Sequence, residues 1–347
     1  IHGKNNFAVG TFGDSILEFT LATPSGETLS CSRERNPEVF HAAIGSFGML
    51  GVFTEMRVKL KRVYSGRLKV TAVATRDLVA NLDYLETHRG EADYLVGWLD
   101  LHARDSALGR GAIHRADQLA AGEDPEGERM LAAERQDVPP RLFYVVPKGW
   151  IWPGMWLFLQ GGMWRLVNAA KFHAGVREAK RPPYLQSHGA FHFLLDYVPN
   201  WKKMTSPGGL IQFQPFVPQA AAERVYRTLI ETCHRAGTVP YLGVLKRHRP
   251  DPFLMTHAVD GYSLAMDFAV SKNPAKRDAL WALCQRMADV VLDAGGRFYY
   301  AKDAVLQASS FPRIHGAAAV AEFRRLKARL DPQAMLATDL SRRMGVV

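Results

Sequence analysis

Three short stretches of the chain carry residue types that could hold and react with a bound organic molecule. The N-terminal stretch joins Ile1-His2-Gly3-Lys4-Asn5 to Gly10-Thr11-Phe12-Gly13-Asp14, the glycine loop is Gly45–Gly51, and the C-terminal stretch is Tyr299-Tyr300-Ala301-Lys302-Asp303. Glycine tolerates positive φ and lets backbone N–H groups approach a ligand closely. Each glycine-containing stretch alone is equally compatible with ordinary turn chemistry, so the three indicate a site only when they are taken together.

Several common catalytic signatures are absent. The sequence contains no GxGxxG, Walker, HExxH or GxSxG motif, which argues against a Rossmann dinucleotide site, a P-loop, a zincin and a serine hydrolase. The cysteines, Cys31, Cys233 and Cys284, are far apart in no CxxC pair. We therefore expect no disulfide framework and no thiolate zinc site, and a reducing compartment.

His188 and His192 are four residues apart, a spacing that could suggest a metal site. We expect them at the start of a strand, where this spacing puts them on one face about 13 Å apart. We therefore predict no metal, with one histidine in a pocket and the other on the surface.

Hydrophobic periodicity, turn residues and helix caps predict the elements that position these stretches. The expected strands are 16–23, 28–31, 52–60, 67–75, 94–101, 190–197, 210–217, 239–246, 262–270 and 297–301. The expected helices are 36–45, 78–90, 219–236, 274–294 and one near 316–330. Residues 115–140 are polar and poor in structure signals, so we expect a mobile loop there. The pattern predicts an α+β fold with an antiparallel sheet.

The composition is that of a globular protein. The chain has 347 residues, of which 47% are hydrophobic and 22% charged, with a formal net charge of +10. Disorder and coiled coil are excluded, and one large or two medium domains are expected. No run of about 18 uncharged apolar residues is present, so the sequence does not support a membrane-spanning helix.

Much of the positive charge lies in residues 141–187. This segment holds seven Lys and Arg against one acid, and four of the seven tryptophans, Trp150, Trp152, Trp156 and Trp164. Tryptophan with flanking cations is typical of a segment that lies on an anionic bilayer surface. The alternative is a loop whose aromatic residues pack onto the sheet and whose cations are merely solvated. Nucleic acid is not expected, because the long apolar stretches do not suit a strand-binding groove.

In their order and spacing, these motifs resemble a known superfamily. IHGKN…GTFGD, GSFGMLGVFTEMRVKL, YLVGWLD, FHFLLDYVPNW, GGLIQFQPFVP, YLGVLK, GYSLAMDF, GRFYYAKD and LDPQAMLATDLSRR resemble FAD-linked oxidases of the vanillyl-alcohol-oxidase/PCMH superfamily. Within it they are most similar to the decaprenylphosphoryl-β-D-ribose-oxidase-like proteins. The resemblance covers almost the whole chain except about 105–190.

The resemblance implies the C-terminal part of a PCMH-type FAD-binding domain with an inserted antiparallel-sheet cap domain. Residues 1–66 would be the second part of the FAD-binding domain, 67–296 the substrate (cap) domain with a loop or membrane-interface segment at about 115–187, and 297–347 the return to the FAD-binding domain. The family's first flavin subdomain would precede Ile1.

Site residues follow from the same resemblance. Catalysis is expected from Lys302, Lys4 and Tyr299, through a proton path and positive charge near the flavin. The cofactor-binding residues would be His2, Gly3, Lys4, Asn5, Gly10, Thr11, Phe12, Gly13, Gly48, Gly51, Val52, Tyr299 and Lys302. Substrate would contact Trp98, His192, Gln212, Gln214, Lys246 and Ser263. The sequence departs from the family pattern at Ala265, Ser263 and His192, where the family has Cys, Asn and Tyr, which bears on the identity of the substrate.

The resemblance implies an FAD-dependent oxidoreductase acting on CH–OH donors, which oxidises a secondary alcohol of a sugar or a lipid-linked (polyprenyl-phospho) sugar by hydride transfer to flavin N5. FAD is expected to be non-covalent, because no cysteine lies in the three stretches. The alternatives are an aldonolactone oxidase of the gulono- or arabinono-lactone type, a sterol or other double-bond reductase, and a catalytically silent membrane-associated binding subunit. Expected partners are the sugar or lactone substrate, a partner reductase and an anionic membrane contacted peripherally, with a cytoplasmic location on its inner face.

Overall fold

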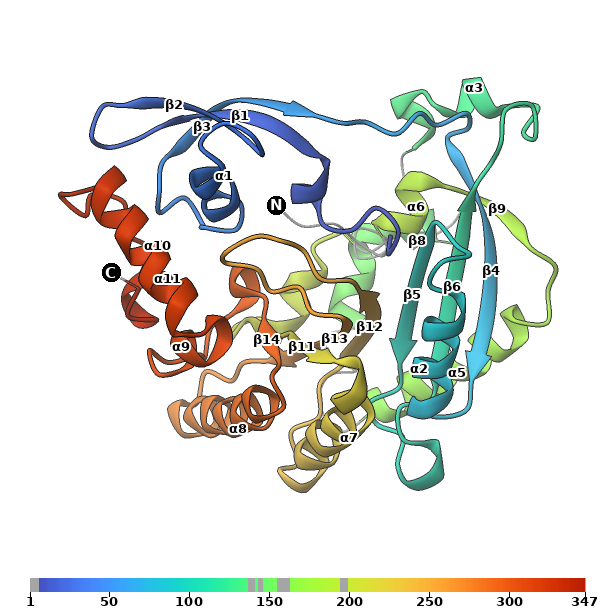
Figure 1. Ribbon diagram of the computed structural model, residues 1–347. Coiled ribbons are helices and arrows are strands. Elements are labelled where there is room, and N and C mark those ends of the chain that lie inside the picture. The colour runs from blue at the N-terminus through green and yellow to red at the C-terminus, as the bar shows by residue number, and fades with distance from the viewer. Residues whose placement is uncertain (1–5, 137–140, 143–145, 155–162, 194–198, 347) are drawn as a thin grey trace.

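The computed structural model describes residues 6–136, 141–142, 146–154, 163–193 and 199–346 (Figure 1). The strands are β1 Ile16–Ala22, β2 Thr28–Ser32, β3 Val52–Val58, β4 Arg67–Thr75, β5 Tyr94–Leu99, β6 Gly111–Gln118, β7 Arg141–Leu142, β8 Val146–Pro147, β9 Tyr184–Ser187, β10 Leu210–Phe213, β11 Pro215–Pro218, β12 Leu242–His248, β13 Gly261–Ala269 and β14 Arg297–Phe298.

The α-helices are α1 Pro37–Ala43, α2 Leu78–His88, α3 Gly127–Met130, α5 Trp164–Glu178, α6 His188–His192, α7 Gln219–Arg235, α8 Pro274–Asp293, α9 Ser310–His315, α10 Ala317–Leu330 and α11 Asp339–Arg343. Short 3-10 helices are η1 Phe12–Ser15, η2 Asp105–Ala107, η3 Ala133–Arg135, η4 Lys148–Trp150, η6 Trp201–Thr205 and η7 Tyr300–Lys302. The predicted α+β class with antiparallel sheets is confirmed.

A small sheet of order β2-β1-β3 packs on α1 near the N-terminus. Phe19 and Leu21 of β1 are fully or almost fully buried. The ring of Phe19 stacks on Phe40 of α1 with their centroids 5.3 Å apart. Burial of these aromatic side chains holds the helix, and with it the start of the glycine loop, on the sheet.

The large sheet has the strand order β14-β11-β13-β12-β5-β6-β4-β9, with β10 also paired to β13. Helices α2 and α7 cover one face of it (Figure 1). Tyr262 of β13 donates a hydrogen bond to the Leu82 carbonyl of α2 at 3.2 Å, and Tyr226 of α7 donates to the Tyr262 carbonyl at 2.6 Å. These bonds satisfy the two phenol groups in an otherwise apolar core.

The opposite face of the large sheet is partly covered by α5, and we call it the α5 face. Gly175 of α5 packs against Ala112 of β6, which is paired with Trp98 of β5. Because paired residues of antiparallel strands point to the same side, Val244, which is opposite Trp98, also lies on the α5 face, together with Ala265. Alternation along each strand then assigns further residues to this face.

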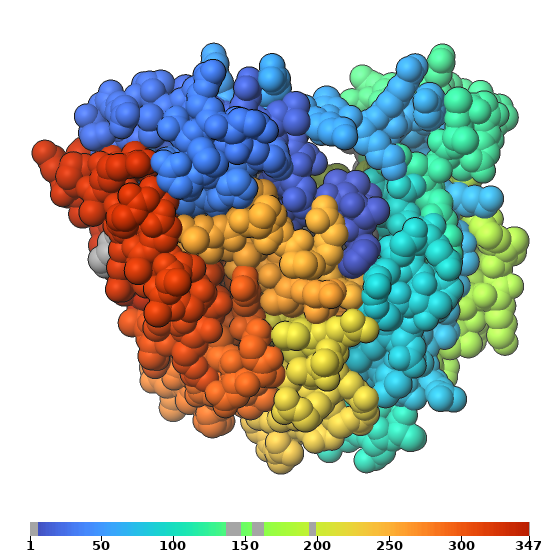
Figure 2. All heavy atoms as spheres, viewed as in Figure 1, coloured from blue at the N-terminus to red at the C-terminus, as the bar shows by residue number. Residues whose placement is uncertain are grey.

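The β12–β13 loop, residues 249–260, lies between the small sheet and the large sheet (Figure 2, orange). Arg249 donates to the Val9 carbonyl and to Asp14, both at 3.1 Å. At the other end of the loop, Arg297 of β14 donates to the Thr256 carbonyl at 3.2 Å. The loop therefore ties the N-terminal stretch to the large sheet.

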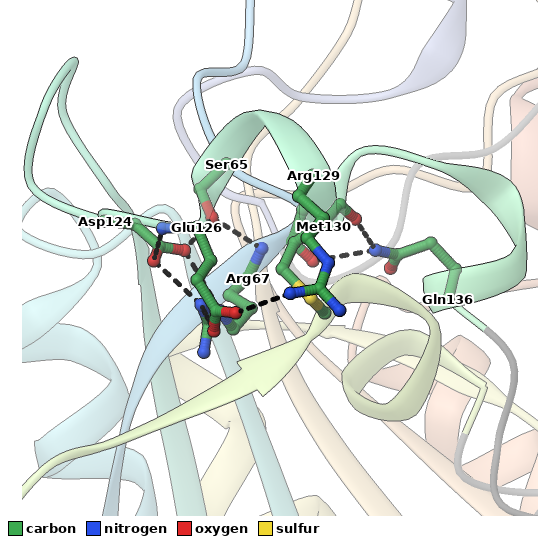
Figure 3. A network of polar contacts seen from close by, with 8 residues as sticks. Ser65, Arg67, Asp124, Glu126, Arg129, Met130 and Gln136 are labelled. Atoms are coloured by element: carbon green, nitrogen blue, oxygen red, sulfur yellow. Dashed lines mark hydrogen bonds and ion pairs between the residues drawn. The ribbon is translucent and has the colours of Figure 1, made fainter.

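Residues 115–140, predicted to form a mobile loop, are ordered over the part that the structure describes, so this prediction was wrong. β6 continues to Gln118, and the segment 119–136 folds back on the start of β4 (Figure 3). The buried Asp124 carboxylate accepts from Ser65 at 2.6 Å and from Arg67 at 2.9 and 3.0 Å. The bond from Ser65 and the Arg67 guanidinium lower the pKa of Asp124. The polar side chains that suggested a loop therefore form hydrogen bonds with distant polar residues of the chain.

Gln136 closes this segment through three backbone groups. Its amide donates to the Gly66 carbonyl at 3.0 Å and to the Met130 carbonyl at 2.5 Å, and it accepts from Gly189 N–H at 3.1 Å (Figure 3). The Gln136 side chain thus joins the end of the segment 119–136 to the residue before β4, to α3 and to α6.

We expect Gln136→Ala to release the segment 119–136. A net hydrogen bond contributes about 0.5–1.5 kcal/mol, and Gln136 makes three, so amide hydrogen exchange across 119–136 should accelerate by at least ~10-fold. Arg129→Ala is the control, because the exposed Arg129–Glu126 pair at 3.3 Å contributes less than about 1 kcal/mol. Equal exchange in the two variants would show that Gln136 does not hold the segment.

Three further element predictions differ from the structure. Residues 188–192 of the predicted strand 190–197 form helix α6, whose N-cap Ser187 accepts from Ala190 N–H at 3.2 Å; residues 194–198 lie outside the described part. The strand 210–217 is broken at Gln214 into β10 and β11, and the strand 297–301 turns into η7 after Phe298. The helix predicted near 316–330 is confirmed as α10, and the short helices α9 and α11 flank it.

The three cysteines are free and buried, as the absence of a pairing pattern predicted. Among the described residues no helix has both the length and the apolar character needed to cross a bilayer.

Candidate active site

The C-terminal stretch lies beside the strands that carry the predicted substrate residues. Tyr299 N–H donates to the Gln214 carbonyl at 3.4 Å, directly after β14 has paired with β11. Gln214 and Gln212 both reach partners on the α5 face of β13, as their alternation around the buried Phe213 predicted. The structure therefore places Tyr299 beside Gln214 at the β10–β11 break, whereas Lys4 lies outside the described residues.

A buried hydrogen-bonded chain runs from Gln214 into the sheet. The Gln214 amide donates to Ser263 Oγ at 3.5 Å, and Ser263 Oγ is 2.8 Å from Nε2 of His248. Burial, and after it the positive charge of Lys246, lowers the pKa of His248 well below its usual value. A neutral imidazole can accept from the serine hydroxyl, which leaves that oxygen to accept from Gln214 and directs the amide.

Asp267 is a titratable residue of the site that the sequence did not single out. Its Oδ1 accepts from the Gln212 amide at 2.5 Å, and its Oδ2 is buried without a hydrogen-bond partner among the described residues. Burial raises the pKa of Asp267 to about 6, while the Gln212 hydrogen bond and the charge of Lys302 act in the opposite direction. The influence of Lys302 places its ammonium within electrostatic reach of this carboxyl.

Lys246 and Trp98 extend the site across the α5 face. Lys246 is opposite Ser263 in the β12–β13 ladder, and Trp98, on β5, is opposite Val244. Trp98 is 7% exposed, and the ammonium of Lys171 from α5 lies 4.5 Å from its ring centroid. Five predicted substrate residues, Trp98, Gln212, Gln214, Lys246 and Ser263, therefore share one face of the sheet.

His192 contacts the same face farther along β5. Its ring contacts Tyr94, four residues before Trp98 on β5, with the centroids 4.6 Å apart. The rings of His188 and His192 are stacked at 5.8 Å, so the separation of about 13 Å predicted for a strand was wrong. The reason is the helix α6, since residues four apart are neighbours on a helical surface. Within the described ranges, no group of three or more potential metal ligands is found.

The N-terminal stretch lines a cleft of about 480 Å³. Gly10 and Phe12 form one wall, and His188 and Gln136 contribute to others. Gly10 has a φ of +79°, and a Cβ there would collide with Arg249 and Asp14. A Cβ on Gly13 would collide with Phe253. Protein contacts thus account for these two glycines.

Of the other predicted residues in the N-terminal stretch, the structure describes Thr11 and Phe12 but not the first four. Thr11 precedes η1 as its N-cap, and Phe12 is 40% exposed. His2, Gly3, Lys4 and Asn5 lie outside the described residues.

The glycine loop meets the C-terminal stretch from the other side. The ring of Phe47 lies 5.7 Å from that of Tyr300, and Lys327 of α10 donates to the Met49 carbonyl at 2.9 Å. Gly48 has a φ of +76° with open space where a Cβ would stand, whereas Gly51 is packed against Leu21 and the Ala22 carbonyl. The next residue, Val52, is 60% exposed.

The residues that sequence reasoning missed lie in the loop and strands that connect the three stretches. His257 of the β12–β13 loop has its ring 5.2 Å from that of Tyr299, and burial lowers the pKa of His257 to about 4. Asp267 could have been found, because it shares the strand parity of Ser263. Nothing in the sequence marks the β12–β13 loop as the bridge between the stretches.

Comparisons with known proteins agree with the motif resemblance. The chain is 24% identical over 370 aligned positions to decaprenylphosphoryl-beta-D-ribose oxidase of Mycolicibacterium smegmatis, an alignment that covers all of this chain and 72% of the relative. Over 56 residues, 16% of this chain and 10% of the relative, it is 45% identical to a putative D-arabinono-1,4-lactone oxidase of Neurospora crassa. Over 58 residues, 17% of this chain and 12% of the relative, it is 38% identical to cytokinin dehydrogenase 2 of Arabidopsis thaliana. No family model matches the chain.

Proposed function

We infer that this chain, an FAD-dependent oxidoreductase of the vanillyl-alcohol-oxidase/PCMH superfamily by its relatives, oxidises a secondary alcohol of a polyprenyl-phosphate-linked sugar. The observation that carries the proposal is the convergence of Gln212, Gln214 and Ser263 with the C-terminal stretch on the α5 face. The relative aligned over the full chain is named for a substrate of that class. The lactone oxidase matches only a short region, which favours a shared cofactor site more than a shared substrate.

The residues present fit a flavin at the meeting point of the three stretches. Gly48 has a positive φ and open space where a Cβ would stand, and Asp267 has a buried carboxylate oxygen without a hydrogen-bond partner among the described residues. We assign flavin contacts to Gly48, Val52, Tyr299 and Lys302, and keep His2 to Asn5 and Gly10 to Gly13 as predictions. When bound, FAD supplies the acceptor for the hydride of the substrate carbinol carbon.

The protein's own part in the reaction is binding and charge. Gln212 and Gln214 offer amides to sugar hydroxyls, and Lys302 would stabilise the negative charge that a bound flavin gains with the hydride. Asp267 acts through Lys302 and Gln212, because as a carboxylate it attracts the ammonium of Lys302 and accepts the glutamine N–H. Tyr299, whose pKa is raised by burial, is a neutral hydrogen-bond donor at the edge of this group.

The proposal is tested by flavin reduction. The flavin-loaded protein should bleach at its visible absorption maximum when it is mixed anaerobically with a short-chain prenylphosphoryl-β-D-ribose. Acid precipitation should leave the flavin in the supernatant, because no cysteine lies in the stretches that would contact it. Bleaching by D-arabinono-1,4-lactone alone would favour the lactone oxidase, and no bleaching by any donor would indicate a silent binding subunit.

The domain organisation is part of the proposal. We assign 1–66 and 297–347 to the flavin side and 67–296 to the substrate side. The contacts of Phe47 with Tyr300 and of Lys327 with Met49 support this, because they join the first and last parts of the chain. The cytoplasmic location and a partner reductase that accepts the electrons remain parts of the same proposal.

We also propose peripheral contact with an anionic membrane through the segment 141–187. Trp150 is 78% exposed and Leu166 is 68% exposed. Trp164 is used differently, since its indole N–H donates to the Tyr241 carbonyl at 2.6 Å. Trp156 lies outside the described residues.

The protein is expected to co-sediment with phosphatidylglycerol vesicles at low salt and to dissociate as salt rises, because each Lys or Arg near an anionic surface contributes about 1 kcal/mol. Trp150→Ser combined with Leu166→Ser should weaken binding by at least ~10-fold even at low salt, since both side chains lose apolar burial. Met335→Ser is the matched control, because Met335 is 65% exposed in the C-terminal part of the chain. If the wild-type protein stays in the supernatant at low salt, the proposed membrane contact is wrong.

A further inference from the structure

Lys171 of α5 borders the proposed substrate site, although the sequence placed it only in the basic segment. Its Nζ lies 4.5 Å from the ring centroid of Trp98. Trp98 is opposite Val244, and Lys246 follows Val244 by two residues on the same face of β12. Lys246 therefore lies on the same face of the sheet as Trp98, and Lys171 reaches Trp98 from the helix that covers this face.

Among the described residues, Lys171 has no counter-ion, because none of the ion pairs there includes it. Its ammonium lies over the neutral indole of Trp98. The side chain is exposed to solvent, yet the surrounding protein desolvates the ammonium and lowers the pKa of Lys171 to about 8. An accessible but partly desolvated cation gains more binding free energy from an anionic ligand than a fully hydrated cation does.

Two acidic groups near the site, Asp267 and Glu178, do not act as a counter-ion for Lys171. Asp267 is engaged by Gln212 and by the charge of Lys302. Glu178, seven residues after Lys171 on α5, lies 3.5 Å from His114 and accepts from Tyr184 at 2.7 Å. These two carboxylates thus have other partners, and neither forms an ion pair with Lys171 among the described residues.

We propose that Lys171 and Lys246 together bind a phosphoryl group of the substrate, and that this contact selects a phosphate-bearing sugar over a neutral sugar or lactone. The inference rests on the proposed function and names its substrate class. A phosphoryl oxygen accepts from ammonium groups as a point charge, which is the contact that lysine provides. Trp98 then supplies the apolar wall on which the Lys171 stem and the ligand rest.

Three variants separate this role from packing. Lys171→Met keeps the length and apolar stem of the side chain but removes the charge, and Lys171→Arg keeps the charge. Lys180→Met is the matched control, because it removes a lysine charge just beyond the end of the same helix. All are tested as flavin-loaded full chains.

Binding is measured by calorimetry with farnesyl phosphate, inorganic phosphate and farnesol, and turnover with farnesylphosphoryl-β-D-ribose and methyl β-D-ribofuranoside. Lys171→Met is expected to raise Kd for farnesyl phosphate and KM for the phosphorylated sugar by at least ~10-fold, the range of a hydrogen bond to a charged group. kcat and the values for farnesol and the methyl riboside should stay within about twofold. Lys171→Arg should lie within about threefold of the wild type, and Lys180→Met should match it.

Each outcome bears on one claim. Lys171→Met protein that binds farnesyl phosphate as tightly as the wild type overturns the assignment, and so does an equal loss for farnesol, which would indicate packing. Inorganic phosphate that competes with farnesyl phosphate supports recognition of the phosphoryl group itself, whereas the lack of competition at saturating phosphate counts against it. If the wild type reduces its flavin with neither sugar, the proposed function fails whatever the lysine variants do.

Discussion

Lys302→Ala is expected to lower the rate of flavin reduction by at least ~100-fold, the scale of a positioned electrostatic or proton-transfer group. Lys302 follows Tyr299 in the C-terminal stretch, and its charge acts on the buried Asp267. Without the ammonium, the charge that develops during hydride transfer has no counter-charge there. KM should change much less than kcat, because the loss is specific to the transition state.

Anaerobic stopped-flow absorbance measures this directly. Lys302→Arg should recover part of the rate, and Lys272→Ala is the control for a lost surface charge, because Lys272 is exposed in the turn before α8. A loss of less than tenfold for Lys302→Ala would remove Lys302 from the catalytic residues. Lys246→Ala, in contrast to Lys302→Ala, is expected to raise KM and to change kcat little. The reason is that a residue that anchors the substrate stabilises the ground state and the transition state equally.

Asp267→Asn is expected to lower activity and to raise stability. Asp267 is 1% exposed, and burial raises the pKa of its carboxyl from 3.8 to about 6. Between these values the folded state binds the proton that the unfolded state has lost, so stability falls as pH rises from about 4 to 6 and stays lower above that. At pH 8 the ionised carboxylate costs roughly 2–3 kcal/mol, which asparagine removes while it keeps the acceptor for Gln212.

Thermal unfolding and turnover measured at several pH values separate the two effects. At pH 8 the variant should melt several degrees higher than the wild type, and the difference should vanish near pH 4. Its kcat should be at least ~10-fold lower at pH 8, and it should lose the fall in activity that the wild type shows below pH 6 as Asp267 takes up a proton. Asp83→Asn, on the exposed side of α2, is the control. A variant with wild-type kcat and pH profile would show that the carboxylate serves only the fold.

A large part of the fold could be predicted from the sequence, because local signals and burial agree there. The strands of the small sheet, β4, β5, β12 and β13, and the helices α2, α7 and α8 lie close to their predicted ranges. In α7 the buried residues repeat with helical spacing, and at the start of α8 the Asn273 side chain accepts from Lys276 N–H at 3.2 Å. Such signals lie within one element, so they can be interpreted without knowing its neighbours.

Predictions failed where a distant partner decides the local structure. Residues 119–136 look like a loop because their polar side chains have no partners nearby in sequence. Asp124 finds its partners at Ser65 and Arg67, more than fifty positions earlier. The same holds for α6, where the Gly66 carbonyl accepts from His188 N–H at 3.1 Å and thereby starts a helix in a strand-like sequence.

The sequence alone determined the kind of protein: three stretches whose order and spacing identify the flavin-linked superfamily, and an alternation that puts Gln212 and Gln214 on one face. Only the tertiary structure decided how the stretches meet. The β12–β13 loop contacts the N-terminal stretch through Arg249 and the C-terminal stretch through His257. Asp267 lies within the GYSLAMDF motif without being singled out by it, and Lys171 lies on α5, which carries no motif. The physical reason is that a sequence motif reflects interactions within one segment of the chain. The pKa of Asp267 and the desolvation of Lys171 arise from packing between segments, which becomes definite only when the chain has folded.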